Sequence, residues 1–400
     1  MISLNGKCIV LGVTGSIAAY KSAMLASMLV KAGADVQVIM TQNATNFINP
    51  ITFETLTHNR CITDTFDRAH EYNVEHVSLA KRADVFMVAP ASANVIGKIA
   101  GGIADDMLTT TIMACGCKKI ISPAMNTGMF HNPIVQDNLR KLRSYGYEVV
   151  SPDSGFLACG DTGDGRMPEP ETLFKYILKE TAYEKDLLGI TALVTAGPTR
   201  EAIDPVRFIT NHSTGKMGYA IAGNLAMRGA EVKLVSGPVS IAPPPFVELI
   251  DVTSAADMAD AVKAYSDESD IIIKSAAVAD YRPVDPADEK IKKSDEEAVI
   301  RLERTEDILA YLGRNRRPGQ FICGFSMETE NLLENSVAKL HKKNVDMIVA
   351  NNLKVDGAGF GTDTNVVTII TKDDVKELPI MSKDEVAAAI VDEILSKKDR

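Results

Sequence analysis

The sequence lacks the long apolar segment of a membrane protein, since no apolar run reaches the roughly 18 residues that cross a bilayer. Its N-terminus is apolar at first, but Gly12, Gly15 and Ser16 interrupt the stretch where a signal peptide is continuous. A strand, a glycine turn and a helix explain this segment better. We therefore expect a cytoplasmic protein without a membrane partner.

The sequence also lacks tryptophan, a disulfide framework and an excess of basic residues. Its formal net charge of −10 argues against a nucleic-acid partner, because nucleic-acid binders normally carry a basic footprint. The six cysteines are scattered, and the close pair Cys115 and Cys117 has a spacing that suits neither a zinc knuckle nor a redox CxxC motif. Small molecules that carry phosphate are not excluded, because local lysine clusters matter more than the net charge.

The pattern of apolar residues predicts an α/β protein with two domains. Short β-branched runs alternate with longer helical stretches, which is typical of βαβ units and mostly parallel sheets. A chain of 400 residues exceeds what one hydrophobic core usually serves, and the pattern starts again at residue 188. We expect Rossmann-like, three-layer domains at residues 1–187 and 188–400, with the polar helical stretch 171–186 as the linker.

In the first domain, polar loops follow the predicted strands at the carboxyl edge, where open α/β sheets bind ligands. Residues 12–16 (GVTGS) end a strand and open a helix, which favours an anion at the helix N-terminus. There is no GxGxxG motif and no acidic residue after the second strand, so a mononucleotide fits better than a dinucleotide. A plain tight turn at 12–16, and helix caps at Ser92 or Asn94, would explain the same residues without a ligand.

Three further positions of this domain are candidates for catalysis or substrate binding. His76 precedes the third strand, although a lone histidine is more often a satisfied surface or core residue. Asn126 follows the fourth strand, again at the carboxyl edge. Cys159 is central in the glycine-rich segment 155–167, whose composition suits a mobile lid.

The motifs GVTGSIAAYK (12–21), PASAN (90–94), PAMNTGM (123–129) and ACGDTGDGRM (158–167) together resemble the flavin-dependent cysteine decarboxylases, and specifically the phosphopantothenoylcysteine decarboxylases. The resemblance covers residues 1–180 and implies a flavodoxin-like flavoprotein domain that binds FMN. The implied FMN contacts are Gly15, Ser16, Thr41, Ser92 and Asn94.

The same resemblance implies roles for the remaining candidates. His76 would be the catalytic histidine, and Cys159 would be the proton donor. Asn126 and Met129 would hold the substrate carboxylate. Phe130 stands where these enzymes usually have tryptophan, and we expect this to alter packing against a neighbour rather than the chemistry.

In the second domain, the segment 195–218 leads from a strand to a helix and combines cations, hydroxyls and glycines, which suits an anion. It is not a P-loop, because Lys216 is followed by methionine. The charged segment 283–298 is predicted to be a mobile surface flap, although a charge run is usually plain solvated surface. Lys339 and Lys343 are four residues apart and share one helical face, where an anion would relieve their repulsion.

The motifs GPTREAIDPVRFITNHSTGKMG (197–218) and SAAVADYRP (275–283) resemble phosphopantothenate–cysteine ligases over residues 188–400. The resemblance implies that CTP, with Mg2+, activates the phosphopantothenate carboxylate as an acyl-cytidylate, which the amine of cysteine then attacks. Asn211 would hold the acyl-cytidylate, and Lys290 would neutralise charge in the transition state. The implied nucleotide contacts are Ala276, Ala277, Asp280, Phe325, Lys339 and Lys343.

The two resemblances together predict a bifunctional enzyme of coenzyme A biosynthesis. Its substrates would be phosphopantothenate, cysteine, CTP and phosphopantothenoylcysteine. The family implies a homo-oligomer, with trimeric flavin domains and dimeric ligase domains. Two alternatives are another flavin-dependent enzyme, such as a flavin prenyltransferase or a peptidyl-cysteine decarboxylase, and a flavin-binding scaffold without activity. Product analysis with phosphopantothenate, cysteine and CTP separates the three.

Overall fold

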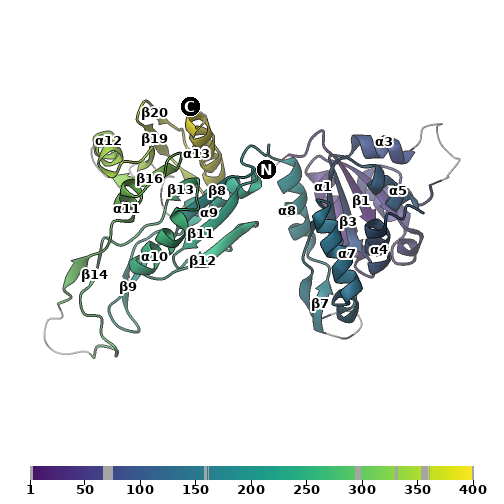
Figure 1. Cartoon of the computed structure of the whole chain (residues 1–400), viewed down its shortest axis with the longest axis horizontal. Coiled ribbons are helices and arrows are strands. Elements are labelled where there is room, and N and C mark those ends of the chain that lie inside the picture. Colours follow the sequence, from purple (N-terminus) through teal and green to yellow (C-terminus); the bar gives the residue numbers. More distant parts are fainter. Residues whose placement is uncertain are drawn as a thin grey trace. The chain divides into compact units, whose positions relative to one another are not determined.

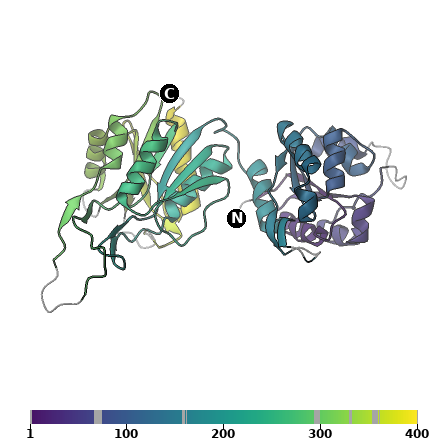
Figure 2. The same ribbon diagram turned by 60° about the horizontal axis from the view of Figure 1, so that its bottom comes forward.

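The computed structural model describes residues 3–65, 75–156, 160, 162–292, 299–328, 332–352, 359 and 361–398. The chain divides between Glu184 and Lys185 into two compact units, which we call unit 1 and unit 2 (Figure 1). Each unit has a mostly parallel sheet with helices on both faces, as the views in Figures 1 and 2 show. The predicted α/β class with two three-layer domains is therefore confirmed.

Unit 1 is built on a five-stranded, entirely parallel sheet with the order β2-β1-β3-β4-β5. This order is that of flavodoxin-like folds, as the sequence predicted. The strands are β1 (Cys8–Val13), β2 (Asp35–Met40), β3 (Val85–Ala91), β4 (Lys118–Pro123) and β5 (Glu148–Val149). β1 and β3 are buried at every position, because helices cover both faces of the sheet.

Two groups of helices cover the sheet of unit 1. On one face α1 (Ala19–Lys31) packs against α2 (Pro50–Thr57) and α8 (Pro170–Thr181). The other face carries α3 (Glu75–Arg82), α4 (Ala93–Gly101), α5 (Met107–Ala114) and α7 (Pro133–Ser144). The short helices η1 (Gln42–Asn46) and α6 (Thr127–Phe130) follow β2 and β4.

One expectation for the end of unit 1 was wrong, and the glycine-rich segment contains a hairpin, which does not test its predicted role as a lid. The stretch 171–186 is not a linker, because most of it forms α8, whose Leu173 and Ile177 are fully buried in unit 1. Its polar residues occupy the outer face of the helix, and that composition misled the prediction. The hairpin in the glycine-rich segment pairs β6 (Asp153–Phe156) with β7 (Thr162–Arg166) in antiparallel orientation.

Unit 2 is built on an eight-stranded sheet with the order β12-β11-β8-β13-β16-β17-β19-β20. Its first six strands are parallel and β19 and β20 run antiparallel at one edge. The strands are β8 (Thr191–Ala196), β11 (Glu231–Ser236), β12 (Val247–Asp251), β13 (Ile271–Lys274), β16 (Phe321–Glu328), β17 (Met347–Asn352), β19 (Val367–Thr371) and β20 (Val375–Glu377). The parallel part has the strand order of a Rossmann fold.

The helices of unit 2 define two core layers. α9 (Lys216–Met227) and α13 (Lys383–Lys398) cover one face of the sheet. α10 (Ala255–Ser266), α11 (Ile308–Arg314) and α12 (Leu332–Lys343) cover the other. Within the described residues, no helix of either unit is both long and apolar enough to span a membrane.

Three antiparallel pairs extend from the sheet of unit 2. They are β9 (Arg200–Ala202) with β10 (Phe208–Thr210), β14 (Tyr281–Pro283) with β15 (Leu302–Arg304), and β18 (Thr364–Asn365) with β21 (Met381–Ser382). The segment 195–218 therefore contains a hairpin, where the sequence predicted a continuous loop. The predicted flap at 283–298 leaves the end of β14, and only 283–292 of it lies among the described residues.

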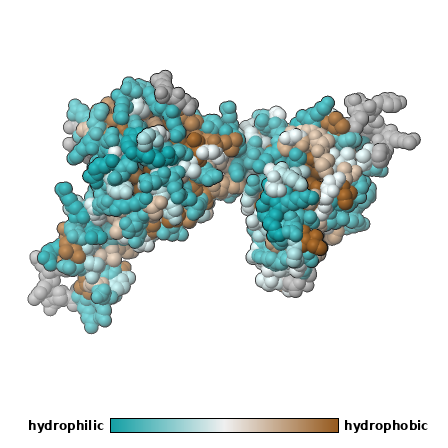
Figure 3. Space-filling model, in the orientation of Figure 1, coloured by the Kyte–Doolittle hydropathy of each residue, from teal (hydrophilic) through white to brown (hydrophobic). Residues whose placement is uncertain are grey.

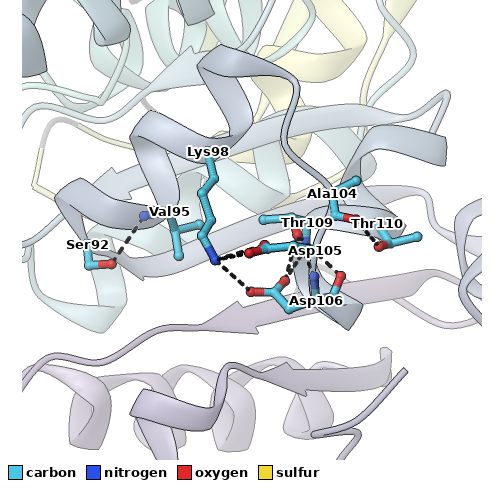
Figure 4. A network of polar contacts seen from close by, with 8 residues as sticks. All are labelled: Ser92, Val95, Lys98, Ala104, Asp105, Asp106, Thr109 and Thr110. Atoms are coloured by element: carbon cyan, nitrogen blue, oxygen red, sulfur yellow. Dashed lines mark hydrogen bonds and ion pairs between the residues drawn. The ribbon is translucent and has the colours of Figure 1, made fainter. Parts of the chain in front are cut away.

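The N-terminus of α5 shows how local sequence sets a helix start in unit 1 (Figure 4). Asp106 accepts a hydrogen bond from the backbone N–H of Thr109 at 2.8 Å, and Thr109 Oγ1 accepts one from Asp106 N at 3.2 Å. These two bonds form a capping box, which satisfies two N–H groups that would otherwise lack partners. The neighbouring Asp105 pairs with Lys98 of α4 at 2.8 Å, and Asp106 also lies 3.8 Å from this ammonium group.

We expect Asp106→Ala to destabilise unit 1 by about 1 kcal/mol, since it removes the cap of α5. For a unit of this size such a loss lowers the melting temperature by about 2–4 °C. Asp105→Ala is the matched control and should change the melting temperature less, because exposed ion pairs contribute little. Thermal unfolding followed by circular dichroism measures both, and equal shifts for the two variants would contradict the capping argument.

Candidate active sites

In unit 1 the loops at the carboxyl ends of β1, β3 and β4 are held together by hydrogen bonds. Thr14 Oγ1 donates to Pro90 O at 2.7 Å and accepts from Ser92 N at 2.9 Å. Ala124 N donates to Ala91 O at 3.1 Å. The three predicted motifs at 12–21, 90–94 and 123–129 therefore form one continuous edge.

The loops after β1 and β2 contribute closely spaced backbone and a buried hydroxyl group to this edge. Gly15 lies so close to the loop after β2 that a Cβ there would come within 2.8 Å of Asn43 Cβ. Thr41 N donates to Val13 O at 3.0 Å, which fixes the start of η1. Thr41 Oγ1 is buried and has no hydrogen-bond partner among the described residues. A buried hydroxyl without a partner is costly unless a ligand or water pairs with it.

Ser92 and Asn94 lie where α4 begins, and their roles differ. Ser92 accepts a hydrogen bond from Val95 N at 3.5 Å, so it caps the helix, as the alternative interpretation proposed (Figure 4). Asn94 is exposed in the first turn of α4. Neither observation tests a flavin contact, which remains a prediction for both residues.

A cavity of about 340 Å³ opens beside these loops. Its described lining includes Ser16, Tyr20, Asn126, Phe156 and Arg166. Lys21 lines it as well, and its buried ammonium group donates to Met167 O at 2.8 Å and to Glu169 at 3.0 Å. The hydrogen bond from Lys21 holds the pKa of Glu169 below its ordinary value. The lining of the cavity is mostly apolar, and Lys21 brings a fixed ammonium group to it.

The loop after β4 places Asn126 at the cavity and its neighbours around a short helix. Asn126 Oδ1 accepts from Gly128 N at 2.8 Å and caps α6. Met129 is half exposed. Phe130 packs on the core of unit 1 and meets His131 edge to face, with ring centroids 5.3 Å apart. The aromatic ring at position 130 therefore packs against residues of unit 1 itself.

Of the two predicted catalytic residues of unit 1, only His76 is among the described residues, and it does not line the cavity. His76 is the second residue of α3, which packs with α5. Cys159 lies outside the described residues. Gly15, Thr41, Ser92, Asn94 and Met129 lie on the same edge of the sheet or beside it but do not line the cavity either. All seven assignments stay predictions.

In unit 2 the segment after β13 is joined to the loop after β8. Ala277 N donates to Gly197 O at 2.9 Å, and Thr199 N donates to Ala277 O at 3.3 Å. The side chain of Asn211 donates to Ala277 O at 2.9 Å. Ala276 is buried beside them. The structure thus brings together Asn211 and the Ala276–Ala277 backbone, which are 65 residues apart in the sequence.

The N-terminus of α9 forms a second polar corner of unit 2. Gly215 adopts a left-handed conformation, with φ at +78°, just before the helix. Gly218 lets α9 approach β8, since a Cβ there would come within 2.6 Å of Ala196 Cβ. Lys216 donates to Asp363 at 2.7 Å, and burial together with Lys216 lowers the pKa of Lys383. A small cavity of about 40 Å³ lies between these residues.

The predicted nucleotide contacts fall on both faces of the sheet in unit 2. Lys339 Nζ donates to Phe325 O at 2.9 Å, whereas the ring of Phe325 packs on the opposite face, beside α9 and α13. Lys343 is ion-paired with Asp307. Burial raises the pKa of Asp307, but Lys343, the backbone N–H of Ala310 and Lys274 together lower it below its ordinary value. Asp280 is exposed, and its backbone oxygen accepts from Thr305 N at 3.0 Å.

The described part of the flap is held at Ile291 by Asp204 and Arg207, and at Ala287 by a backbone bond from Ala287 N to Ile203 O at 2.9 Å. Ile291 N donates to Asp204 at 3.2 Å, and Arg207 donates both to Asp204 and to Ile291 O. The hydrogen bond from Arg207, with backbone bonds, lowers the pKa of Asp204. Lys290 precedes this anchor and is exposed. Neither Asp204 nor Asp307 was predicted as a functional residue. Asp204 lies within the motif at 197–218, but its contact with Ile291 spans 87 residues, and Asp307 is 36 residues from its partner Lys343.

No group of three or more histidine, cysteine or acidic side chains that could hold a metal ion occurs in the part of the chain that the structure describes. The described residues therefore offer no protein cage for Mg2+. A metal that enters with a triphosphate needs few protein ligands, because Mg2+ is often held mainly by substrate phosphates and water.

The sequence is similar to known families and proteins over its whole length. Residues 3–182 match the family described as "Flavoprotein", and residues 187–397 match the "DNA/pantothenate metabolism flavoprotein C-terminal domain". The protein "Coenzyme A biosynthesis bifunctional protein CoaBC" of Bacillus subtilis is 50% identical over 401 residues, which cover 99% of this chain and 98% of that protein. The proteins of that name from Haemophilus influenzae and Escherichia coli are 43% and 41% identical, and cover 99% and 100% of this chain and 99% of each relative.

Two solved structures match one half of the chain each. The C-terminal domain of a coenzyme A biosynthesis bifunctional protein CoaBC is 49% identical, and the match covers 54% of this chain and 100% of that one, with a TM-score of 0.46. The FMN binding protein AtHal3 is 32% identical, and the match covers 43% of this chain and 95% of that one, with a TM-score of 0.39.

We expect Asp204→Asn to loosen the flap of unit 2 at Ile291, because the neutral amide loses the charge-assisted bonds to Arg207 and Ile291. Because the pKa of Asp204 is lowered, the wild type keeps these charge-assisted bonds at neutral pH. It loses their contribution to flap stability only as the pH falls below about 4 and the carboxylate becomes protonated. Amide hydrogen exchange at Ile291 measures both effects. Protection should be lost at neutral pH in the variant.

Asp288→Asn is the matched control, since Asp288 is an exposed carboxylate of the same flap. It should leave the exchange at Ile291 unchanged. Equal protection of Ile291 in the wild type and in Asp204→Asn would show that the carboxylate does not hold the flap.

Proposed function

Because this chain belongs to the family of coenzyme A biosynthesis bifunctional proteins, we propose that it carries out two consecutive steps of that pathway, one in each unit. Unit 2 ligates cysteine to phosphopantothenate at the expense of CTP, and unit 1 decarboxylates the phosphopantothenoylcysteine that results. The observation that carries this proposal is the similarity to such proteins across both units, over 99% of the chain. An enzyme with a flavin domain alone would leave the family match of residues 187–397 unexplained, and a scaffold would leave the polar edges unexplained.

In unit 2 the ligation needs an activated carboxylate and a bound nucleotide. A carboxylate oxygen of phosphopantothenate attacks the α-phosphorus of CTP and releases pyrophosphate, and the amine of cysteine then attacks the acyl carbon and releases CMP. Asn211 would hold the acyl-cytidylate, and the bond from its amide to Ala277 O supports this role because it holds the side chain beside the predicted nucleotide contacts. Lysines stabilise the negative charge that builds up on the phosphates. Lys339 and Lys343 supply such charge, and Lys290 on the flap can close over the triphosphate and exclude water.

In unit 1 the residues of the carboxyl edge suit FMN. The buried Thr41 hydroxyl lacks a partner, the loop after β1 approaches closely at Gly15, and Ser92 and Asn94 follow β3 on the same edge. When bound, FMN supplies temporary acceptance and return of two electrons, which the loss of CO2 from a saturated carbon requires. Asn126 and Met129 would orient the substrate carboxylate. His76 would act as an acid–base group, and Cys159, outside the described residues, would donate the final proton.

Three further parts of the proposal concern the surroundings of the sites. Mg2+ would enter unit 2 as the complex of CTP, and no step depends on a protein cage for it. We propose a cytoplasmic homo-oligomer, with trimeric flavin domains and dimeric ligase domains. Association between copies is supported by apolar side chains that are exposed on unit 1. Among them are Ile17, Tyr20, Met24, Phe47 and Ile51. Brown, hydrophobic residues are visible between polar ones on the surface in Figure 3.

The whole proposal is tested by supplying phosphopantothenate, cysteine and CTP and analysing the products. Formation of CMP, pyrophosphate and CO2 in equal amounts supports it. Absence of CMP or of CO2 would disprove the corresponding half.

We expect Lys290→Gln to slow ligation by about 100-fold or more, because one lost electrostatic contact to a transition state has this effect. Decarboxylation of added phosphopantothenoylcysteine should remain unchanged, since Lys290 lies in unit 2. CMP release and CO2 release report the two reactions separately. Lys292→Gln, which removes another exposed flap lysine, should retain ligation. Normal ligation by Lys290→Gln would remove the assigned role.

We expect Thr41→Val to weaken FMN binding by about threefold to tenfold, which corresponds to one neutral hydrogen bond. Stability without FMN should be unchanged or slightly higher, because valine removes a buried hydroxyl that lacks a partner. Flavin fluorescence titration of the apoprotein gives the affinity. Thr45→Val is the control, since Thr45 donates to Gln42 O within η1. Unchanged FMN affinity of Thr41→Val would exclude the contact.

A further inference from the structure

Lys274 has an unusual position at the carboxyl end of β13. The three isoleucines before it are fully buried, and Lys274 itself is half-buried. Side chains alternate along a strand, and Ile272 belongs to the core layer under α10, α11 and α12. Lys274 therefore faces the same layer. In the sheet it pairs with Thr195 of β8 and Gly324 of β16, neither of which offers a charge.

The charged neighbours of Lys274 come from three elements on that face. Lys339 and Lys343 lie on α12, Asp307 caps α11, and Asp280 follows β13. Lys339 is bonded to Phe325 O, and Lys343 is paired with Asp307. Lys274 Nζ donates to Ala276 O at 3.5 Å, which is the outer limit of a hydrogen bond. Its ammonium group is thus the weakly held member of a three-lysine cluster.

The cluster has more positive than negative charge near Lys274. Three ammonium groups face two carboxylates, so a ligand with several negative charges would be attracted to this corner. The pKa of Lys274 is lowered to about 8, mainly by burial and also by Lys339 and Lys343, against the opposing effect of Asp307 and Asp280. A purely structural lysine would be expected to find a carboxylate or several carbonyl groups, because burying an unpaired charge is costly.

We propose that Lys274 is a third phosphate-binding cation of unit 2, which takes up a proton when an anionic nucleotide binds beside Lys339 and Lys343. The identity of that ligand as CTP rests on the proposed function, whereas the need for a polyphosphate rests on the lysine cluster alone. Lys274 directly follows the buried β13 and directly precedes the segment that carries Ala276, Ala277 and Asp280. It therefore connects the sheet to the predicted nucleotide contacts.

Proton uptake has a defined dependence on pH. Below pH 8 Lys274 is already protonated in the free protein, and ligand binding involves no uptake. Above pH 8 the ligand must bind with a proton, so its affinity falls as the pH rises, by about tenfold between pH 7 and pH 9. Arginine keeps its charge throughout this range, and methionine never carries one.

The experiment measures the binding of CTP and of inorganic tripolyphosphate by calorimetry at pH 7, 8 and 9. The full-length wild type is compared with Lys274→Met, Lys274→Arg and Lys342→Met. Lys342 is an exposed lysine of α12, so Lys342→Met controls for the loss of one charge on the same helix. Thermal unfolding checks that each variant is folded. Lys274→Met should be at least as stable as the wild type, since it removes a costly buried charge.

We expect the wild type and Lys342→Met to lose about tenfold in affinity for either probe between pH 7 and pH 9. Lys274→Met should bind about tenfold more weakly at pH 7 and show no fall with pH. Lys274→Arg should bind at pH 7 within a few-fold of the wild type and also lack the fall.

Two results would overturn the inference. The first is that the wild type binds both probes with the same affinity at pH 7 and pH 9. The second is that Lys274→Met is folded and binds both probes as tightly as the wild type. If tripolyphosphate behaves as expected and CTP does not bind, Lys274 is a phosphate-binding residue and the proposed CTP-dependent reaction is wrong. If neither probe binds the wild type, both proposals fail.

Discussion

The loops at the carboxyl edges of both sheets are held in shape by hydrogen bonds from one loop to the next. In unit 1 the Thr14 hydroxyl joins the loop after β1 to the loop after β3. In unit 2 Ala277 is bonded on both sides to the loop after β8. These loops carry backbone groups that parallel strands leave without partners, and such groups must be satisfied somewhere. Their mutual bonding is what places the candidate residues near one another, so the sites depend on it.

The local concentration of lysines explains how an acidic protein can offer positive groups to a phosphate. The net charge of −10 is spread over the surface, whereas lysines are concentrated at defined points of unit 2. Lys339 and Lys343 stand one helical turn apart, and Lys274 reaches the same face from the sheet. Partial burial strengthens the interaction of such charges with a ligand, because less water surrounds them. It also makes an unoccupied cluster costly, which favours a ligand of several negative charges.

The two units use the same kind of edge for different chemistry. Unit 1 offers hydroxyl and amide groups beside a mostly apolar cavity, an environment suited to a flat aromatic cofactor. Unit 2 offers lysines, a left-handed glycine before α9 and a flap anchored by Asp204, which are suited to phosphates. The sheet architecture they share does not distinguish them. The difference comes from the residue types on the loops.

The sequence by itself determined the layer structure and the residue types of the edges. The apolar pattern predicts strands at 35–40, 191–196 and 231–236, and β2, β8 and β11 have these bounds. The periodicity of buried residues is a local property of the chain, so the sequence is enough to predict it. The sequence did not determine that 171–186 is mostly a core helix, since the composition of that stretch is polar on average.

Only the tertiary structure decided which polar residues meet. Asp204 and Ile291 are 87 residues apart, and Lys274 and Lys339 lie on different elements. Their proximity follows from strand order and from the face that each side chain occupies, and one residue of register would reverse that face. It was also the tertiary structure that kept His76 away from the lining of the cavity in unit 1. A motif names the residue types at a site, but long-range packing sets the distances between them.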